Sequence, residues 1–98
     1  MDYKLVFSSR SESETKDALD YYDHIDARLG ERFFIELLEA YQKIIAAPQY
    51  YSFVSSVRKR NLRDIKLPSF PYVVIYEVAG DVINIISVMN SYRKPFPT

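Results

Sequence analysis

Residues 70–89, which read FPYVVIYEVAGDVINIISVM, decide the fold of this chain. They hold two apolar runs rich in valine and isoleucine, which favour β-strands, on either side of the short segment 79–81. Three residues with a central glycine are typical of a β-hairpin with a three-residue loop. Both runs have apolar residues at odd and even positions, so both faces of the sheet must be shielded from water. The stretch therefore predicts a hairpin at the centre of a sheet.

Two other segments have a weaker strand pattern. Residues 3–8 (YKLVFS) show a period of two with β-favouring side chains, which predicts a short strand. Residues 57–67 (VRKRNLRDIKL) are too polar for a central strand, and lysine and arginine at a sheet edge discourage association with other sheets. We therefore expect an edge strand at 57–67, preceded by a connecting loop at 48–56.

A first helix is predicted between the strands. Ser11 and Glu14 have the spacing of a capping box, in which each side chain accepts a hydrogen bond from an otherwise unpaired backbone N–H, so the helix is expected to begin there. Gly30 is expected to end it, because glycine readily adopts the left-handed conformation that follows many helices. The predicted buried stripe consists of Ala18, Tyr22, Ile25 and Leu29.

A second helix is predicted from residue 31 to residue 47, where Pro48 stops it. Its predicted buried stripe consists of Phe34, Leu37, Leu38, Tyr41 and Ile45. The short connection makes the two helices antiparallel neighbours, which pack as a hairpin on one face of the sheet. The prediction is a single α+β domain over residues 1–98, in the order β-α-α-β-β-β, with a mainly antiparallel four-stranded sheet. Because the helices cover one face, we expect a partner chain to cover the other.

Residue inventory excludes several kinds of chemistry. The chain has no cysteine and one histidine, His24, so disulfides, thiolate sites, histidine-based catalytic triads and multi-histidine metal centres are excluded. We expect no metal and no cofactor. No apolar stretch approaches the roughly 18 residues needed to cross a membrane, and the first residues do not resemble a signal peptide. These features predict a cytoplasmic protein that does not bind membranes.

Charge is distributed unevenly along the chain. The formal net charge is zero, but residues 1–47 carry an excess of four negative charges and residues 48–98 an excess of four positive charges. Such a polar molecule can attract an anionic partner to one end. A general nucleic-acid binder would need a much larger positive excess.

Several short motifs occur together in a characteristic order. They are Ala18, Tyr21 and Tyr22 in the first helix, Arg32 and Phe33 in the second, Phe70, Pro71 and Tyr72 before a strand, and Arg93 and Pro95 after the last strand. With almost the whole chain around them, these motifs resemble the RelE/ParE superfamily of bacterial type II toxin–antitoxin systems. The resemblance implies a growth-inhibiting toxin with a role in plasmid stabilisation. It also implies a cognate antitoxin whose C-terminal segment wraps around the toxin surface.

The superfamily includes two toxic activities. RelE-like members cut messenger RNA in the ribosomal A site without a metal, whereas ParE-like members inhibit DNA gyrase. For the first activity the candidate catalytic residues are Arg60, Arg63, Tyr92 and Arg93, with Lys59 or Lys66 as a base if its pKa were depressed. The basic residues at 58–66 also fit a solvated edge strand without any further role.

One position departs from the superfamily pattern. Members commonly carry a histidine three residues before the terminal arginine, and this chain has Asn90 there. An amide cannot exchange a proton near neutral pH as an imidazole can. The neutral net charge, the long helical hairpin and the missing proton-transfer pair favour the ParE-like activity. A ribosome-dependent endoribonuclease and a non-toxic interaction module of the same fold stay as alternatives, so partners beyond the antitoxin are either gyrase or the ribosome with messenger RNA.

Overall fold

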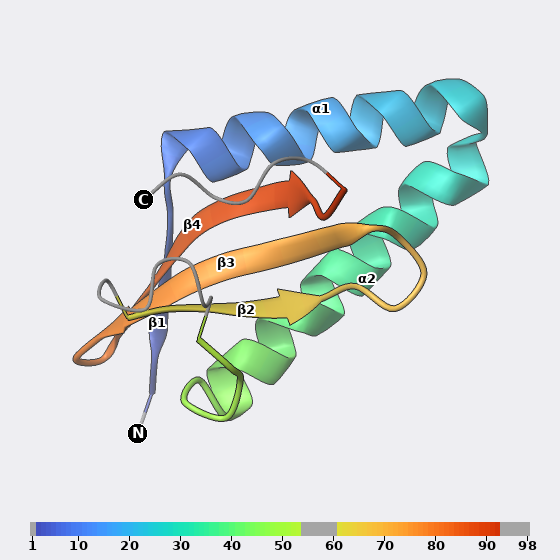
Figure 1. Cartoon of the computed structure of the whole chain (residues 1–98). Helices are drawn as coiled ribbons and strands as arrows, with labels where there is room; N and C mark the ends of the chain where they lie inside the picture. Colours follow the sequence, from blue (N-terminus) through green and yellow to red (C-terminus); the bar gives the residue numbers. More distant parts are fainter. Residues whose placement is uncertain (1, 54–60, 93–98) are drawn as a thin grey trace.

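Two helices pack against one face of a four-stranded sheet in the computed structural model, which describes residues 2–53 and 61–92 (Figure 1). The elements are β1 (Lys4–Phe7), α1 (Ser9–Ile25), α2 (Ala27–Ala46), β2 (Leu62–Lys66), β3 (Tyr72–Ala79) and β4 (Val82–Asn90). This order confirms the predicted α+β fold. Within the described part of the chain, neither helix has the length and apolarity needed to cross a membrane.

The sheet has the strand order β1-β4-β3-β2. The β3–β4 hairpin lies at its centre and β2 pairs antiparallel with β3 at one edge, as predicted. The short strand β1 pairs in parallel with β4 at the other edge, so the sheet is mixed. Residues 57–60 of the predicted edge strand lie outside the described residues, and β2 itself starts at Leu62.

The β3–β4 loop is shorter than predicted. Ala79 pairs with Val82, so the loop consists of two residues, Gly80 and Asp81, instead of three. Gly80 has a φ of 63°, in the left-handed region that glycine adopts without a steric penalty. Two-residue loops are favoured here because their backbone twist matches the twist of the flanking strands.

The start of α1 differs from the predicted capping box. The helix begins at Ser9 with Ser8 as its N-cap, and the Ser8 hydroxyl accepts a hydrogen bond from the backbone N–H of Ser11 at 3.0 Å. The Ser11 hydroxyl donates back to the Ser8 carbonyl at 2.8 Å. Glu14 takes no part in the cap, because its carboxylate is bonded to β4. The same Ser8 hydroxyl donates to the carbonyl of Ile86 at 2.8 Å, which ties the helix start to the sheet.

The prediction that Gly30 ends the first helix is wrong. The helix ends at Ile25, and Asp26 forms the break: its N–H donates to the Tyr22 carbonyl, and its carboxylate accepts from the N–H of Arg28 to cap α2. Gly30 is buried inside α2, where a Cβ atom would overlap the Asp23 carboxylate. The glycine serves the close approach of the two helices.

The buried side of α2 is also turned relative to the prediction. Leu37 and Tyr41 are buried as expected, but Phe34, Leu38 and Ile45 are exposed. The residues that α2 buries are Gly30, Phe33, Glu36, Leu37, Ala40, Tyr41 and Ile44. The helix therefore keeps apolar side chains on its solvent side. On α1, Ala18 is buried and Ile25 is exposed.

The main core lies between the helices and the sheet, with Phe33, Tyr76 and Ile85 fully buried in it. The opposite face of the sheet carries a smaller cluster of Leu62, Val73 and Ile75, which are all buried within the chain itself. The expected open apolar face is therefore not observed there. The large apolar side chains that do stay exposed lie mostly on the helices.

Candidate functional site

Arg63, the described arginine of the predicted catalytic set, holds the segment that follows α2. Its guanidinium donates hydrogen bonds to the carbonyls of Gln49 at 3.2 Å and Tyr51 at 2.7 Å. It also lies 4.0 Å from the centre of the Phe53 ring, a cation–π contact. Both carbonyls are reached by one nitrogen of the guanidinium, Nη1.

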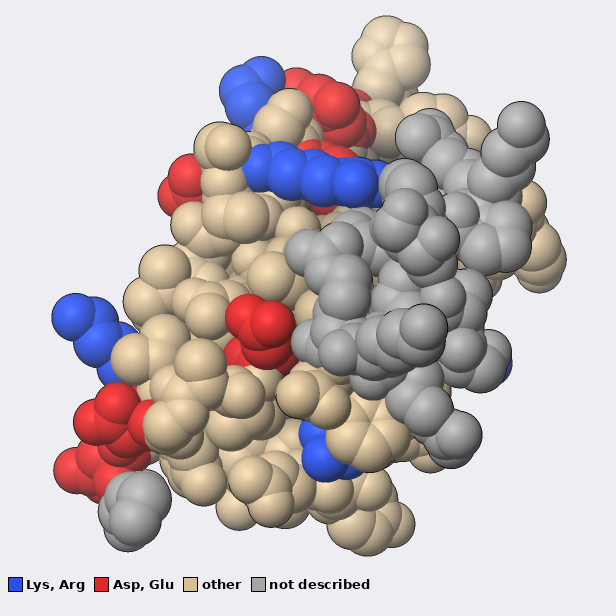
Figure 2. All heavy atoms as spheres, turned by 60° about the vertical axis from the view of Figure 1, so that its left-hand side comes forward, with Lys and Arg blue, Asp and Glu red and all other residues tan. Residues whose placement is uncertain are grey.

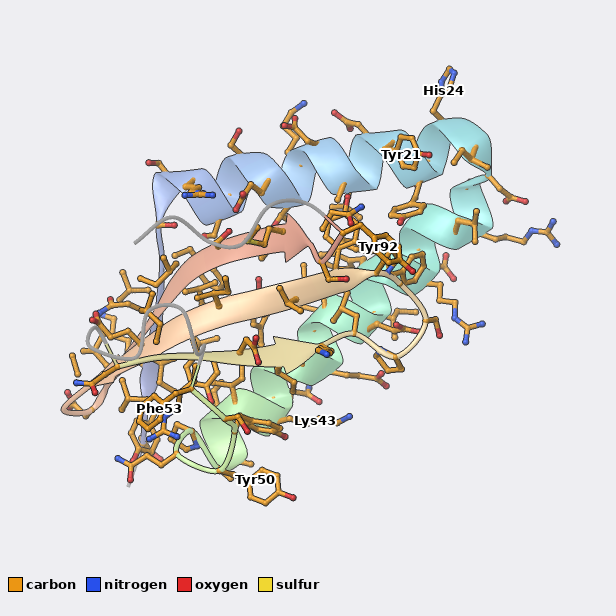
Figure 3. The ribbon with its side chains drawn as sticks, viewed as in Figure 1. Tyr21, His24, Lys43, Tyr50, Phe53 and Tyr92 are labelled. Carbon is orange, nitrogen blue, oxygen red and sulfur yellow. The ribbon has the colours of Figure 1, made fainter. Side chains whose placement is uncertain are left out.

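Tyr92 lies far along the sheet from Arg63. Arg63 pairs with Tyr76, whereas Asn90, just before Tyr92, pairs with Tyr72. Four residues of strand separate the two positions, or about 13 Å at roughly 3.3 Å per residue. Figure 3 shows Tyr92 beyond the end of β4 and Phe53, the ring that Arg63 contacts, at the other end of the sheet.

The remaining candidates do not complete a site among the described residues. Arg60, Arg93 and Lys59 lie outside the described residues, and Lys66 is exposed on β2. Tyr92 is 87% exposed, and its backbone N–H donates to the Asn90 side chain at 2.9 Å. His24, to which the sequence assigned no role, is exposed on α1 and points away from the molecule (Figure 3).

Several titratable groups inside the fold have shifted pKa values. Burial raises the pKa of Tyr41 and that of Tyr76 to about 12. Burial also raises the pKa of Tyr22. Burial raises the pKa of Asp64 as well, although the positive charge of Lys66 acts to lower it. Among residues 2–53 and 61–92, no three His, Asp or Glu side chains gather as a possible metal site.

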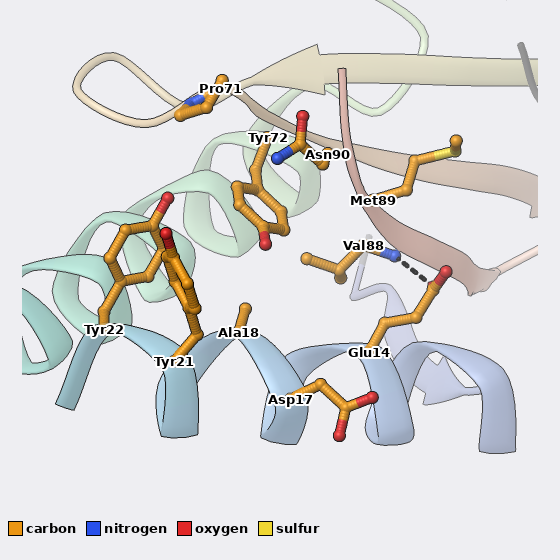
Figure 4. A pocket seen from close by; sticks show the side chains of 10 residues that line it. All are labelled: Glu14, Asp17, Ala18, Tyr21, Tyr22, Pro71, Tyr72, Val88, Met89 and Asn90. Atoms are coloured by element: carbon orange, nitrogen blue, oxygen red, sulfur yellow. Dashed lines mark hydrogen bonds between the residues drawn. The ribbon is translucent and has the colours of Figure 1, made fainter. Parts of the chain in front are cut away.

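One hollow lies where α1 passes the ends of β3 and β4 (Figure 4). It has a volume of about 430 Å³. Its lining consists of Glu14, Asp17, Ala18, Tyr21, Tyr22, Pro71, Tyr72, Val88, Met89 and Asn90. The Tyr22 ring packs against Phe70 at a centroid distance of 4.8 Å and against Phe33 at 5.4 Å, so this tyrosine belongs to the packing, as expected. The Tyr21 side chain stays exposed beside it.

A second hollow, which we call the outer groove, is lined mainly by residues of α1 and α2. These two helices diverge from their connecting turn (Figure 1). Its volume is about 540 Å³. Its lining consists of Phe7, Glu12, Thr15, Lys16, Leu19, Asp20, Asp23, Phe34, Leu37, Leu38 and Tyr41. Phe34 is 46% exposed and Leu38 is 44% exposed. Sequence reasoning assigned both to the core, although their spacing of four marks a common face of α2.

Charged side chains on the described surface are mixed in sign. On the face shown in Figure 2, uncharged side chains predominate, and the described lysines and arginines do not gather into one broad patch. In the outer groove, Lys16 is paired with Asp20 at 3.0 Å, which leaves Glu12 and Asp23 as the excess charge of the lining. The groove is therefore apolar inside and acidic along its α1 side.

Comparisons with known proteins agree with this architecture. The family model described as the ParE toxin of the type II toxin–antitoxin system parDE matches residues 5–95. A solved structure described as the chromosomal ParDE toxin–antitoxin system from P. aeruginosa superposes with a TM-score of 0.76 and 17% sequence identity. That match covers 90% of this chain and 95% of the other. Among curated proteins, none matches this sequence.

Proposed function

The chain belongs to the ParE toxin family of type II toxin–antitoxin systems, and from this premise we propose that it inhibits DNA gyrase and does not cut RNA. The family implies an antitoxin partner, which holds the toxin inactive until it is removed. The proposed place of action is the cytoplasm, where the chromosome and its gyrase lie.

The observation that carries the proposal is the position of Arg63. Metal-free cleavage of RNA needs a cation on the phosphate and a group that exchanges protons, both at one point. The Arg63 guanidinium is instead bonded to two backbone carbonyls and stacked on Phe53. Tyr92, the described candidate for proton donation, follows Asn90, which itself lies four strand positions from Arg63. The amide of Asn90 cannot exchange a proton near neutral pH.

Charge supports the same proposal. A toxin that works within ribosomal RNA gains affinity from many lysine and arginine contacts with phosphates. This chain has 13 basic and 13 acidic residues, so it lacks a general positive excess. Binding to a protein target such as gyrase does not need one.

A supercoiling assay tests the proposal. Purified toxin is added to DNA gyrase and relaxed plasmid, with toxin preincubated with its antitoxin as the control. We expect supercoiling to fall with rising toxin concentration and to be restored in the control. In parallel, RNA from cells that express the toxin is mapped for 5′ ends.

Two results would overturn the proposal. One is full gyrase activity at toxin concentrations that arrest growth. The other is messenger RNA cut at codon boundaries, with the cuts lost in Arg93→Ala, which would establish the endoribonuclease instead. Intact RNA together with inhibited gyrase supports the proposal.

A further inference from the structure

The hollow where α1 passes the ends of β3 and β4, which we call the tyrosine pocket, has aromatic walls. Tyr21 and Tyr22 extend from α1, and Tyr72 comes from the start of β3 (Figure 4). The ring centroids of Tyr21 and Tyr22 lie 5.1 Å apart at 78°, and those of Tyr22 and Tyr72 lie 6.2 Å apart at 67°. Ala18, one turn before Tyr22, adds only a methyl group to the lining. Aromatic side chains gathered around one space are how proteins recognise alkylated ammonium groups.

The core holds two of these rings in place and leaves the third accessible. Tyr22 stacks on Phe33 with 28° between the ring planes, and Tyr72 meets the same phenylalanine at 79°. Tyr21 is 61% exposed. A ligand can therefore cover the Tyr21 ring while Tyr22 and Tyr72 are already fixed, so that little ordering of the walls accompanies binding.

The pocket is negatively charged. Glu14 and Asp17 line it, and its described lining contains no lysine or arginine. Glu14 is committed to the fold, because its carboxylate is bonded to β4 and also pairs with Arg10 at 3.3 Å. A phosphate or a nucleotide would be repelled by these carboxylates, whereas a cation would be attracted.

Asp17 is the carboxylate that can meet a ligand. It precedes Tyr21 by four residues, so the two side chains are neighbours on the surface of α1. Asp17 is exposed and takes part in none of the ion pairs between described residues. The adjacent cation, Lys16, bonds to Asp20 instead at 3.0 Å.

We propose that the tyrosine pocket binds a small organic cation with an alkylated ammonium group, which contacts the rings of Tyr21 and Tyr72 and pairs with Asp17. The pocket volume of about 430 Å³ lies within the range of about 300–1,000 Å³ that is typical of small-ligand sites. This site goes beyond the proposed function, because neither gyrase nor an antitoxin takes part in the binding.

The probe for the test is choline, and its neutral isostere 3,3-dimethyl-1-butanol is the matched control ligand. Each is titrated into the isotopically labelled full chain at constant ionic strength, and backbone amide shifts are followed by NMR. We expect saturable shifts around residues 17–22 and 88–90. The dissociation constant for choline should be about 10 mM or lower, since two cation–π contacts and one charge contact supply an affinity of this order. The isostere has the same shape without the charge and should bind at least about fivefold more weakly.

Two variants of the pocket test the contacts separately. Asp17→Asn removes the charge and should weaken choline binding about fivefold, whereas Asp20→Asn, the same change on α1 outside the pocket, should have less than about a twofold effect. Tyr21→Leu removes an aromatic face and should weaken binding at least about threefold, whereas Tyr21→Phe keeps the face and should bind like the parent. Tyr50→Leu, at a tyrosine that is 80% exposed and remote from the pocket, should also bind like the parent.

Weaker binding of the isostere, together with weaker choline binding by Asp17→Asn and Tyr21→Leu, supports the inference. Equal binding of choline and its isostere would overturn it, because the pocket would then select an apolar shape and not a charge. The absence of saturable shifts, shifts confined to another part of the chain, or parent-like binding by both variants would overturn it as well. The NMR spectra show whether each variant is folded, and the two pocket variants test the site independently of one another. Because toxicity is not measured, failure of this inference leaves the gyrase proposal untouched, and failure of the gyrase proposal leaves this inference untouched.

Discussion

The Glu14 carboxylate on α1 accepts a hydrogen bond from the buried Ser87 hydroxyl of β4 at 2.6 Å. The same carboxylate oxygen accepts from the backbone N–H of Val88 at 3.0 Å. Strand β1 pairs with β4 as far as Ile85, so within residues 2–53 and 61–92 this part of β4 has no strand beside it on that side. A helix side chain thus takes the place of a neighbouring strand and joins the helical layer to the sheet edge (Figure 4).

Replacing Glu14 should therefore destabilise the fold. Glu14→Ala removes the acceptor of a buried hydroxyl and of a strand N–H, and leaving such groups unpaired costs about 1–3 kcal/mol in the free energy of unfolding. Urea denaturation followed by circular dichroism measures the loss. The control is Asp17→Ala, an exposed position one turn further along α1, which should change the free energy by less than about 0.5 kcal/mol. Equal effects from the two variants would contradict the assigned role.

Arg63 gives a prediction that separates a structural role from a catalytic one. Arg63→Lys keeps the positive charge but loses the guanidinium Nη1 donor that reaches the carbonyls of Gln49 and Tyr51, so we expect a loss of about 1–2 kcal/mol in the free energy of unfolding. Amide hydrogen exchange at residues 49–53 should become faster. Lys66→Ala, on the exposed end of the same strand, should leave both unchanged. Loss of toxicity in a fully folded Arg63→Lys protein would argue for a direct functional role instead.

The elements that the sequence predicted well are those with a dense local signal. The runs that became β3 and β4 are rich in β-branched residues and flank a glycine, so the central hairpin needed no long-range information. The two predicted amphipathic helices precede these strands in the sequence, and this order indicates a layer of helices packed on a sheet.

Long-range contacts explain the elements that were wrong. Ser8, Ser9 and Ser11 are all possible N-cap residues of α1. The N-cap is Ser8, whose hydroxyl also donates a hydrogen bond to the carbonyl of Ile86 in β4. Helix α2 carries apolar side chains beyond its buried side, at Phe34, Leu38 and Ile45, so its own pattern does not decide which apolar stripe faces the sheet. Arg63 resembled a free cation because its carbonyl partners are 12 and 14 residues away in the sequence.

The pKa of Glu36 predicts how the free energy of unfolding changes at low pH. Burial by itself would raise the pKa of Glu36, but hydrogen bonds from Ser69 at 3.0 Å and from Arg32 at 3.2 Å outweigh it and lower the pKa below its ordinary value of 4.5. The folded state therefore holds this proton less readily than the unfolded state, and the stabilisation is present above about pH 4.5 and is lost as the pH falls through the lowered value.

We therefore expect the free energy of unfolding to fall in acid, and part of that fall to disappear in Glu36→Gln. Urea denaturation from pH 7 down to pH 3 measures both curves. Glu39→Gln, at an exposed position of the same helix, is the control and should follow the parent curve. If Glu36→Gln also follows the parent curve, the hydrogen bonds to Ser69 and Arg32 do not stabilise the charged form.

The pKa of Tyr76 predicts how the free energy of unfolding changes at high pH. Its buried hydroxyl donates to the carbonyl of Pro48 at 2.6 Å, which fixes the end of the helical layer to the middle of β3, and burial raises the pKa of Tyr76 to about 12. An unfolded tyrosine loses its proton near pH 10, so the folded state keeps the proton longer, and the free energy of unfolding should fall as the pH rises from about 10 to 12.

Tyr76→Phe should remove part of this fall and cost about 2 kcal/mol at neutral pH, because the Pro48 carbonyl loses its buried donor. Urea denaturation across this range, with the exposed Tyr50→Phe as the control, measures both effects. A Tyr76→Phe protein as stable as the parent at pH 7 would mean that the Pro48 carbonyl reaches another donor once the phenol is gone.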